Sequence, residues 1–328
     1  MNEITPEAIF SIDNPLEFEE IALEIFRHQA IKVPVYKEFV NYLAINPNAV
    51  ERIEDIPFLP VEFFKSHLVT DFNIKNTETV FSSSGTTGSV QSKHVLSDLS
   101  FYEQSFNKAF ELFYGNIEHY VVIALLPSYL ERSGSSLVYM CDHLIKNSID
   151  ERSGFYLNEY EKIKNIIIEN DGLKKVLLIG VTYALLDFAE QFPFEMEHCI
   201  VMETGGMKGK RKEMLREEVH QTLCNAFHLT NIHSEYGMTE LLSQAYSKGN
   251  GIFRTPPWMK IMIRETQDPF SYLKSERTGG INIIDLANLH SCSFIATQDL
   301  GKIYADERFE VIGRFDNADM RGCNLLVQ

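Results

Sequence analysis

Between residues 119 and 227 short apolar stretches alternate with segments of helical periodicity, and this alternation limits the possible folds more than any other feature. The apolar stretches have the length of buried strands and are 119–126, 175–179 and 198–202. The helical segments are 134–145, 159–169, 183–191 and 208–227. Strands that alternate with helices imply a mostly parallel sheet covered by helices on both faces. The sequence therefore predicts an α/β fold.

The chain on either side of this region has a different character. Helices are expected at 15–28, where Asn14 precedes Pro15 as a cap, and at 35–43. An extended segment is expected at 57–65. From about residue 251 the pattern changes to short β-rich segments, which indicate a smaller and more antiparallel lobe: 258–264, 280–286 and 302–313. We expect one core over 1–328, with a helical part at about 1–75, an α/β part at about 76–250 and a β-rich lobe and tail at about 251–328.

Charge and cysteine content exclude several classes of function. The formal net charge of −16 argues against nucleic acid or an anionic membrane as the main partner. The start of the chain has neither the basic nor the apolar region of a signal peptide, and no apolar run reaches the length of a membrane span. The 5 cysteines are scattered without a metal-ligand or disulfide pattern. A cytoplasmic protein with reduced thiols is expected.

A loop of small hydroxyl residues and glycines follows the expected strand 79–81. From Ser82 to Gly88 every side chain is a hydroxyl or a hydrogen, so backbone N–H groups can approach phosphate oxygens closely. The alternative is a flexible surface linker. Its position between a strand and a helix expected at 98–114 favours an anion-binding loop, although the Gly-Lys-Ser/Thr ending of a Walker A loop is absent.

Three later stretches carry residues suited to a nucleotide. Ser234–Glu240 follows an expected short strand, 230–233, and contains Tyr236, a flat surface for a base, and Glu240, an oxygen ligand for Mg²⁺. Asp299 lies in an expected turn, where a carboxylate can accept ribose hydroxyl protons, and Arg314 lies at a strand end. Each stretch is a weak signal by itself, and Ser234–Glu240 alone would be interpreted as an ordinary turn followed by a helix. Because ligands sit beyond the carboxyl ends of parallel strands, the loop, Pro127 and the Gly205-Gly206 pair are expected to converge on one crevice.

In order and spacing, these motifs resemble the signatures of the acyl-adenylate-forming (AMP-binding) ligase superfamily. The resemblance implies an N-terminal core of mostly parallel sheets with a smaller β-rich lobe, and it implies ATP and Mg²⁺ as cofactors. It places the ATP phosphates on the loop, the adenine against Tyr236 and the Gly205-Gly206 pair, Mg²⁺ on Glu240, and the ribose on Asp299 and Arg314. The nucleotide-binding residues that it implies are Ser83, Ser84, Gly85, Thr86, Thr87, Gly88, Gly205, Gly206, Tyr236, Gly237, Thr239, Asp299 and Arg314.

The sequence departs from the superfamily pattern in two places, and its ending resembles one branch. Lys93, the counterpart of the catalytic loop lysine, is separated from Gly88 by Ser-Val-Gln-Ser. The family normally continues past Gly313-Arg314 into a lid domain with a second catalytic lysine, and this sequence ends at Gln328. The ending, with Cys323 beside Gly322 and Arg321, and the stretch 127–139 resemble the acyl-protein synthetase (LuxE-type) branch. That resemblance makes Cys323 the acyl acceptor, although a C-terminal cysteine is by itself more often inert.

The resulting hypothesis is a ligase that activates a carboxylic acid, by resemblance a fatty acid, as acyl-AMP. The acyl group then forms a thioester with Cys323 and passes to a protein partner such as an acyl reductase. Two alternatives remain open: a coenzyme A or carrier-protein ligase with a separate lid domain, and a non-catalytic nucleotide-binding relative. The other cysteines are expected to be structural, and His94 and His233 are as well explained by structural hydrogen bonds as by the crevice.

Overall fold

The computed structural model describes residues 4–71, 76–83, 90–127, 134–170, 172–207, 210–212 and 214–315. The chain divides into two compact units, one formed by Met1–Phe72 together with Pro257–Gln328 and the other by Asn73–Pro256. The helical and β-rich parts that the sequence separates thus belong to one unit, and the α/β part forms the other. Whether the two units act as one catalytic core stays a prediction.

The Asn73–Pro256 unit is built on a sheet whose strands run in the order β5-β4-β6-β7-β8-β9-β10. Neighbours from β5 to β8 are parallel, whereas β9 pairs antiparallel with both β8 and β10. Every residue of β4 is buried. The strand bounds are β4 Tyr120–Leu125, β5 Gly154–Phe155, β6 Lys175–Val181, β7 Cys199–Thr204, β8 His233–Tyr236, β9 Ala245–Ser247 and β10 Ile252–Arg254.

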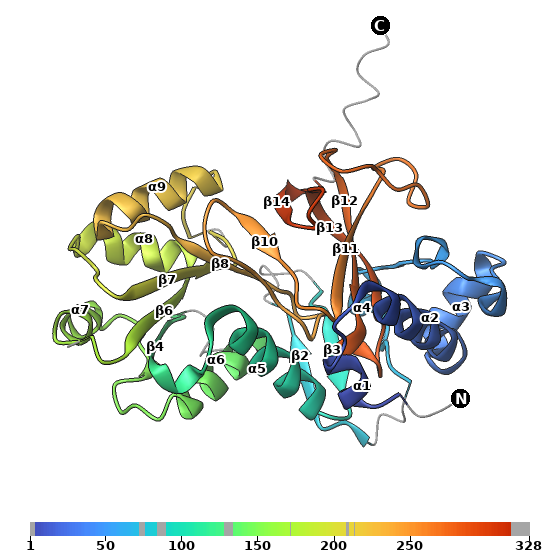
Figure 1. Cartoon of the computed structure of the whole chain (residues 1–328), viewed down its shortest axis with the longest axis horizontal. Helices are drawn as coiled ribbons and strands as arrows, with labels where there is room; N and C mark the ends of the chain where they lie inside the picture. Colours follow the sequence, from blue (N-terminus) through green and yellow to red (C-terminus); the bar gives the residue numbers. More distant parts are fainter. Residues whose placement is uncertain are drawn as a thin grey trace, which may run out of the picture. The chain divides into compact units, whose positions relative to one another are not determined.

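Helices cover both faces of this sheet, as the β–α alternation predicted. Helices α8 and α9 lie on one face, and α5 and α6 lie on the other (Figure 1). Aromatic contacts join each pair, with ring centroids 5.6 Å apart for Phe188 and Phe227 and 6.0 Å apart for Tyr102 and Tyr139. The helix bounds are α5 Ser100–Tyr114, η4 Ile117–His119, α6 Ser136–Asn147, α7 Tyr160–Ile168, α8 Thr182–Gln191 and α9 Arg216–Phe227. The α/β fold class is confirmed.

The Ser/Thr/Gly loop connects two strands instead of a strand and a helix. Strand β2 (Thr79–Ser82) pairs antiparallel with β3 (Lys93–Leu96), and α5 starts only at Ser100. The expected strand-to-helix connection is therefore wrong, because the four residues Lys93–Leu96 return along β2 and bury three of their four side chains.

Two other boundaries in this unit differ from the prediction. Helix α9 starts at Arg216, not at 208, because the Glu218 carboxylate accepts a hydrogen bond from Leu215 N at 3.1 Å and so caps the helix there. The short strand expected at 230–233 is instead β8, so Glu235 and Tyr236 lie in a strand and not after one.

The second unit combines the first helices with an antiparallel sheet. Strands β11, β12, β13 and β14 are antiparallel neighbours in that order, and β1 pairs parallel with the start of β13. Their bounds are β1 Leu59–Pro60, β11 Met259–Arg264, β12 Gly279–Asp285, β13 Phe294–Ile303 and β14 Phe309–Arg314. The helices are α1 Pro6–Phe10, α2 Pro15–Lys32, α3 Pro34–Tyr42, η1 Pro47–Ala49, η2 Ile53–Asp55, α4 Phe63–Ser66 and η5 Leu286–Asn288.

An aromatic core joins the helices of this unit to its sheet. Phe26 of α2, Tyr36 of α3 and Phe294 of β13 contact one another with centroid separations of 6.0 to 6.2 Å. The predicted cap of α2 is confirmed, since Asn14 Oδ1 accepts a hydrogen bond from Glu17 N at 3.0 Å. Burial of these faces is what orders the N-terminal helices.

Four details of this unit differ from the sequence prediction. The segment expected to be extended as far as residue 65 contains the one-turn helix α4. The expected strand 302–313 is interrupted at Tyr304, whose N–H bonds the Arg308 carbonyl at 2.7 Å, so β13 and β14 form a hairpin. Asp299 consequently lies within β13 and not in a turn. Buried Cys292, expected on a strand, lies just before β13.

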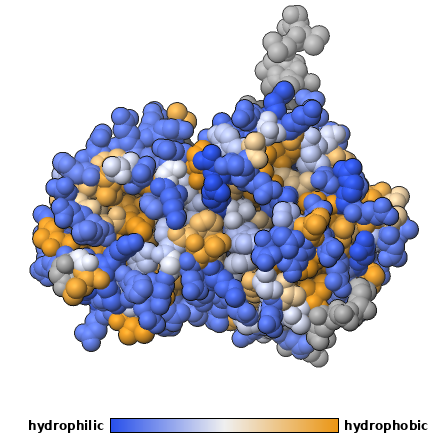
Figure 2. All heavy atoms as spheres, in the orientation of Figure 1, coloured by the Kyte–Doolittle hydropathy of each residue, from blue (hydrophilic) through white to orange (hydrophobic). Residues whose placement is uncertain are grey.

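On the face shown in Figure 2, hydrophilic residues predominate and apolar side chains form separate patches. Within the described ranges, no helix is both long and apolar enough to cross a membrane.

Candidate functional site

The carboxyl ends of β7 and β8 bring two of the sequence motifs together. The register pairs Thr204 with Glu235, the last position at which β7 pairs with β8. Gly205-Gly206 follows β7 directly, and Tyr236 ends β8. Gly205 has a φ of +74°, a backbone conformation that favours glycine. The open end of parallel strands is where α/β sheets bind ligands.

Tyr236 is held by an aromatic neighbour. Its ring contacts Phe253 of β10 edge-on, with centroids 5.9 Å apart and an interplanar angle of 62°. The Arg216 guanidinium lies over the other ring of this pair, 5.2 Å from the Phe253 centroid. The Tyr236 side chain therefore has a fixed direction before any ligand binds.

Two buried glutamates lie at these strand ends, and sequence reasoning did not single out either. Glu203 of β7 is next to Thr204, and Glu235 of β8 is next to Tyr236. Only register and burial distinguish them from the many surface carboxylates of an acidic chain. The only available signal was an acidic residue one or two positions before each motif.

The two carboxyls have opposite pKa shifts. Burial alone would raise the pKa of Glu203, but a hydrogen bond from His220 and the positive charge of Arg216 lower it below its ordinary value. Burial raises the pKa of Glu235 to about 7, and the negative charge of Glu203 adds to that shift while the Thr204 hydrogen bond opposes it. Glu203 is thus ionised at neutral pH, whereas Glu235 titrates near neutral pH.

A buried histidine joins the first motif to the second. His94 of β3 is fully buried, and its Nδ1 lies 2.9 Å from the Thr239 carbonyl oxygen, so Nδ1–H donates. Burial lowers the pKa of His94 to about 4, so the ring is neutral at pH 7. Lys93 precedes His94 in β3, and its side chain is exposed. Glu240 follows Thr239 and is only 6% exposed.

The neck of the Ser/Thr/Gly loop is closed by hydrogen bonds. Ser83 N donates to the Ser92 carbonyl at 3.1 Å, and Ser92 N donates to Ser83 Oγ at 2.9 Å. Ser83 therefore holds the base of the hairpin. The other predicted loop residues, Ser84, Gly85, Thr86, Thr87 and Gly88, lie outside the described residues, as does Cys323.

The other unit brings the two predicted ribose-binding residues together. Asp299 of β13 and Arg314 of β14 are cross-strand partners, and Asp299 Oδ1 lies 3.2 Å from Arg314 Nε. The Asp299 side chain is 12% exposed and that of Arg314 is 72% exposed. Asp299 is fixed further by its own N–H, which donates to Thr297 Oγ1 at 3.0 Å.

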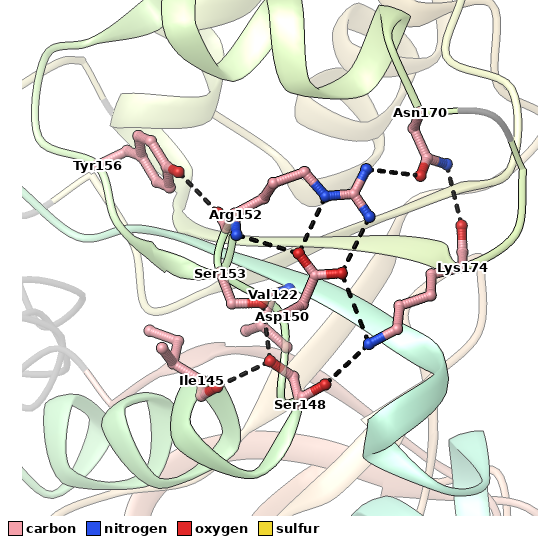
Figure 3. Close-up of polar contacts among 9 residues, drawn as sticks. All are labelled: Val122, Ile145, Ser148, Asp150, Arg152, Ser153, Tyr156, Asn170 and Lys174. Carbon is pink, nitrogen blue, oxygen red and sulfur yellow. Dashed lines mark hydrogen bonds and ion pairs between the residues drawn. The ribbon is translucent and has the colours of Figure 1, made fainter.

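A different polar cluster lies at the amino-terminal edge of the parallel sheet (Figure 3). Asp150 accepts from Arg152 Nε and Nη2, both at 2.9 Å, and its Oδ2 lies 3.5 Å from Lys174 Nζ. Arg152 lowers the pKa of Asp150 to about 2. The cluster joins the end of α6 to the starts of β5 and β6, and we interpret it as structural.

The predicted Mg²⁺ ligand, Glu240, lies among the described residues. Among the described residues, no group of three or more His, Cys, Asp or Glu side chains is arranged to hold a metal. Mg²⁺ in phosphate-transfer sites commonly uses one or two carboxylates, with phosphate and water oxygens completing its shell. The nearly buried Glu240 fits that arrangement.

Comparison with known proteins identifies the fold. No protein-family model matches the sequence. A long-chain-fatty-acid–luciferin-component ligase of Vibrio harveyi is 22% identical over 315 residues, covering 88% of this chain and 82% of that protein. A 2-hydroxyisobutyryl-CoA ligase, solved with an acyl adenylate in its postadenylation state, superposes with a TM-score of 0.68 at 8% identity, covering 96% of this chain and 73% of that one. This chain has the fold of the acyl-adenylate-forming ligases.

A second solved ligase shows how much of such an enzyme the chain represents. ATP-bound MatB from Rhodopseudomonas palustris superposes with a TM-score of 0.53 at 14% identity, over 74% of this chain and 49% of that one. The chain thus spans about half the length of MatB. The resemblance to the acyl-protein synthetase branch, read from the motifs, is confirmed by the Vibrio relative.

Proposed function

We propose that the protein activates a carboxylic acid as acyl-AMP with ATP and then transfers the acyl group to a thiol. The observation that carries this proposal is the meeting of Gly205-Gly206 and Tyr236-Gly237 at neighbouring strand ends in the fold of ligases solved with ATP and with an acyl adenylate. The name of the Vibrio harveyi relative supports a long-chain fatty acid as the substrate.

In the first step a carboxylate oxygen attacks the α-phosphorus, and the bond to the β-phosphate oxygen breaks to release pyrophosphate. Tyr236 and the glycine pair bind adenine, Asp299 and Arg314 bind the ribose, and the loop with Lys93 binds the phosphates. Mg²⁺ on Glu240 would neutralise charge that develops on the phosphates. This is catalysis by orientation and electrostatic stabilisation.

In the second step the Cys323 thiolate attacks the acyl carbonyl, and the bond from that carbon to the AMP oxygen breaks. The thioester then transfers the acyl group to a protein acceptor, for which a reductase is the proposed class. The described cysteines are unsuited to this role: burial raises the pKa of Cys292 and of Cys199 to about 12, and that of Cys141 and Cys224 also rises.

The test is the intact mass of wild-type, Cys323→Ser and Cys292→Ser protein after incubation with ATP, Mg²⁺ and a pool of carboxylic acids. We expect a hydroxylamine-labile acyl adduct on wild type and on Cys292→Ser, the matched control, and none on Cys323→Ser. Pyrophosphate release without an adduct, followed by acyl transfer to added coenzyme A, would identify a coenzyme A ligase. No pyrophosphate with any acid would refute the adenylation step.

A further inference from the structure

The strands β7 and β8 separate after their last paired residues, Thr204 and Glu235. Beyond this point the first strand continues into Gly205-Gly206, and the second continues into Tyr236-Gly237. These are the two segments proposed to enclose adenine. A bond between the two strands at this position therefore controls the distance between the two segments.

The last pair is joined through side chains. Thr204 Oγ1 donates to Glu235 Oε2 at 2.5 Å, and the two residues are only 4% and 9% exposed. A hydrogen bond in such a buried position is electrostatically stronger than one on the surface. It fixes the residue before Gly205 to the residue before Tyr236.

The other carboxyl oxygen of Glu235 lies against the second segment. A Cβ at Gly237 would be 2.6 Å from Glu235 Oε1, closer than real Cβ contacts. Its next neighbour would be Gln244 Cγ at 3.4 Å, an ordinary distance. A side chain at position 237 would therefore displace the Glu235 carboxyl group.

We propose that Glu235 is a positioning residue whose carboxyl group fixes the Gly205-Gly206 segment relative to the Tyr236-Gly237 segment and so sets the width of the adenine site. One oxygen holds Thr204, and the other supports Gly237. The inference rests on the proposed function, since it concerns the same nucleotide site. Glu235 does not act on the reacting atoms.

The surroundings of Glu235 allow the carboxyl to act in this way. It is influenced by Glu203 of β7, by Tyr102 and Tyr114 of α5, by Cys141 of α6 and by Tyr246, its cross-strand partner on β9. Burial raises the pKa of each of these tyrosines and of Cys141, so they are neutral around pH 7. None of these groups supplies a positive charge that would draw the carboxyl away from Thr204.

The test measures the dissociation constants of AMP and ATP by calorimetry for four variants of the whole protein. Thr204→Val and Glu235→Ala are expected to weaken both nucleotides about tenfold, because each removes one side of the bridge. Glu235→Gln keeps an acceptor for Thr204 and should stay within about threefold of wild type. The control Thr182→Val removes a similar buried bond, from Thr182 Oγ1 to Glu203 Oε2 at 3.2 Å, and should leave both constants unchanged. Thermal stability is recorded for every variant.

A double-mutant cycle tests the contact with Gly237. Gly237→Ala should weaken AMP about tenfold in wild type but only about twofold in the Glu235→Ala background, where the clashing oxygen is gone. Additive effects, or unchanged binding by Thr204→Val and Glu235→Ala, would overturn the inference while leaving the proposed function intact. Absence of AMP and ATP binding by wild type would overturn both. If Glu235→Ala does not fold, Thr204→Val and Glu235→Gln decide between these results.

Discussion

Single residues at the ends of β7 and β8 show how position changes the chemistry of one side-chain type. Glu203 lies beside His220 and Arg216 and carries its charge in spite of burial, whereas Glu235 lies among neutral hydroxyls and gives up its charge more readily. The difference arises because alternate residues of a strand face opposite sides of the sheet. The ends of two adjacent strands thereby carry an ionised carboxyl on one face of the sheet and a carboxyl that titrates near pH 7 on the other.

The raised pKa of Glu235 predicts a pH-dependent cost of folding. Its folded pKa of about 7 exceeds its ordinary value of 4.5, so the folded state holds more protons between these values, and stability falls as pH rises through this range. Glu235→Gln removes this contribution. The variant should gain stability relative to wild type from about pH 4.5 to 7, with a constant gain of at most about 3 kcal/mol above that range. Urea unfolding of wild type and Glu235→Gln at several pH values measures the difference in stability. A difference that does not change with pH would contradict the raised pKa of Glu235.

The ribose-binding role proposed for Asp299 leads to a prediction. Asp299→Ala should weaken ATP about tenfold, because a carboxylate that accepts ribose hydroxyl protons is lost. The variant should also lose the preference for ATP over 2′,3′-dideoxy-ATP, which lacks those hydroxyls. Asp306→Ala breaks a comparable Asp–Arg pair on the surface, with Arg308, and serves as the control. If the wild type bound ATP and 2′,3′-dideoxy-ATP with equal affinity, Asp299 would be excluded from this role.

At the scale of elements, local sequence patterns predicted the helices and strands that are determined by residues close together in the chain. The apolar runs that became β4, β6 and β7, and the helices α2, α3 and α5 to α8, were found within a few residues. The return strand β3 was missed, because Lys93–Leu96 is too short to show a period. The turn at Tyr304–Arg308 contains neither glycine nor proline, so nothing in it marked the end of β13.

In the candidate site, too, some residues could be predicted from the sequence and others could not. Tyr236, the Gly205-Gly206 pair, Asp299 and Arg314 were recognised as members of known motifs. The importance of Glu203, Glu235 and Thr204 depends on the register between strands, and sequence spacing carries no information on register. His94 was noticed, but its bond to Thr239 spans segments that only the fold brings together.

The cluster around Asp150 leads to a prediction about stability alone. Asp150→Asn removes the charge that Arg152 and Lys174 share and should cost roughly 1–3 kcal/mol of unfolding free energy at pH 7. The folded pKa of Asp150, about 2, lies below its ordinary 3.8, so the stabilisation is present above about pH 4 and is lost as pH falls toward 2. Chemical denaturation at pH 7 and at pH 2.5 checks both parts. The ATP dissociation constant should not change, since this edge is opposite the strand ends that form the site.

On the scale of the whole molecule, one unit is assembled from the two ends of the sequence. Gln29 of α2 is fully buried, and its Nε2 donates to the carbonyls of Asn288 and Leu289, both at 2.9 Å. Its Oε1 accepts from Ser293 N at 3.0 Å. These bonds join positions about 260 residues apart and connect the first helices to the antiparallel sheet.

Replacement of Gln29 tests this connection. Gln29→Leu removes all three of these buried hydrogen bonds and should lower the unfolding free energy by about 3 kcal/mol or more. Gln221→Leu, on the exposed side of α9, is the matched control and should stay within about 0.5 kcal/mol of wild type. Denaturant titration compares the two. Equal stability of both variants would show that the Gln29 bonds do not hold the unit together.

The discontinuous unit also has a consequence for synthesis on the ribosome. Its helices emerge first, but the sheet that covers their apolar faces is translated only after the whole of Asn73–Pro256. At about 5–20 residues per second, translation of the intervening unit leaves these faces uncovered for on the order of 10–40 s. The intervening unit, by contrast, is made of one continuous stretch and is complete as soon as Pro256 has been added. The nascent N-terminus is therefore the segment of this protein with the greatest need for a chaperone.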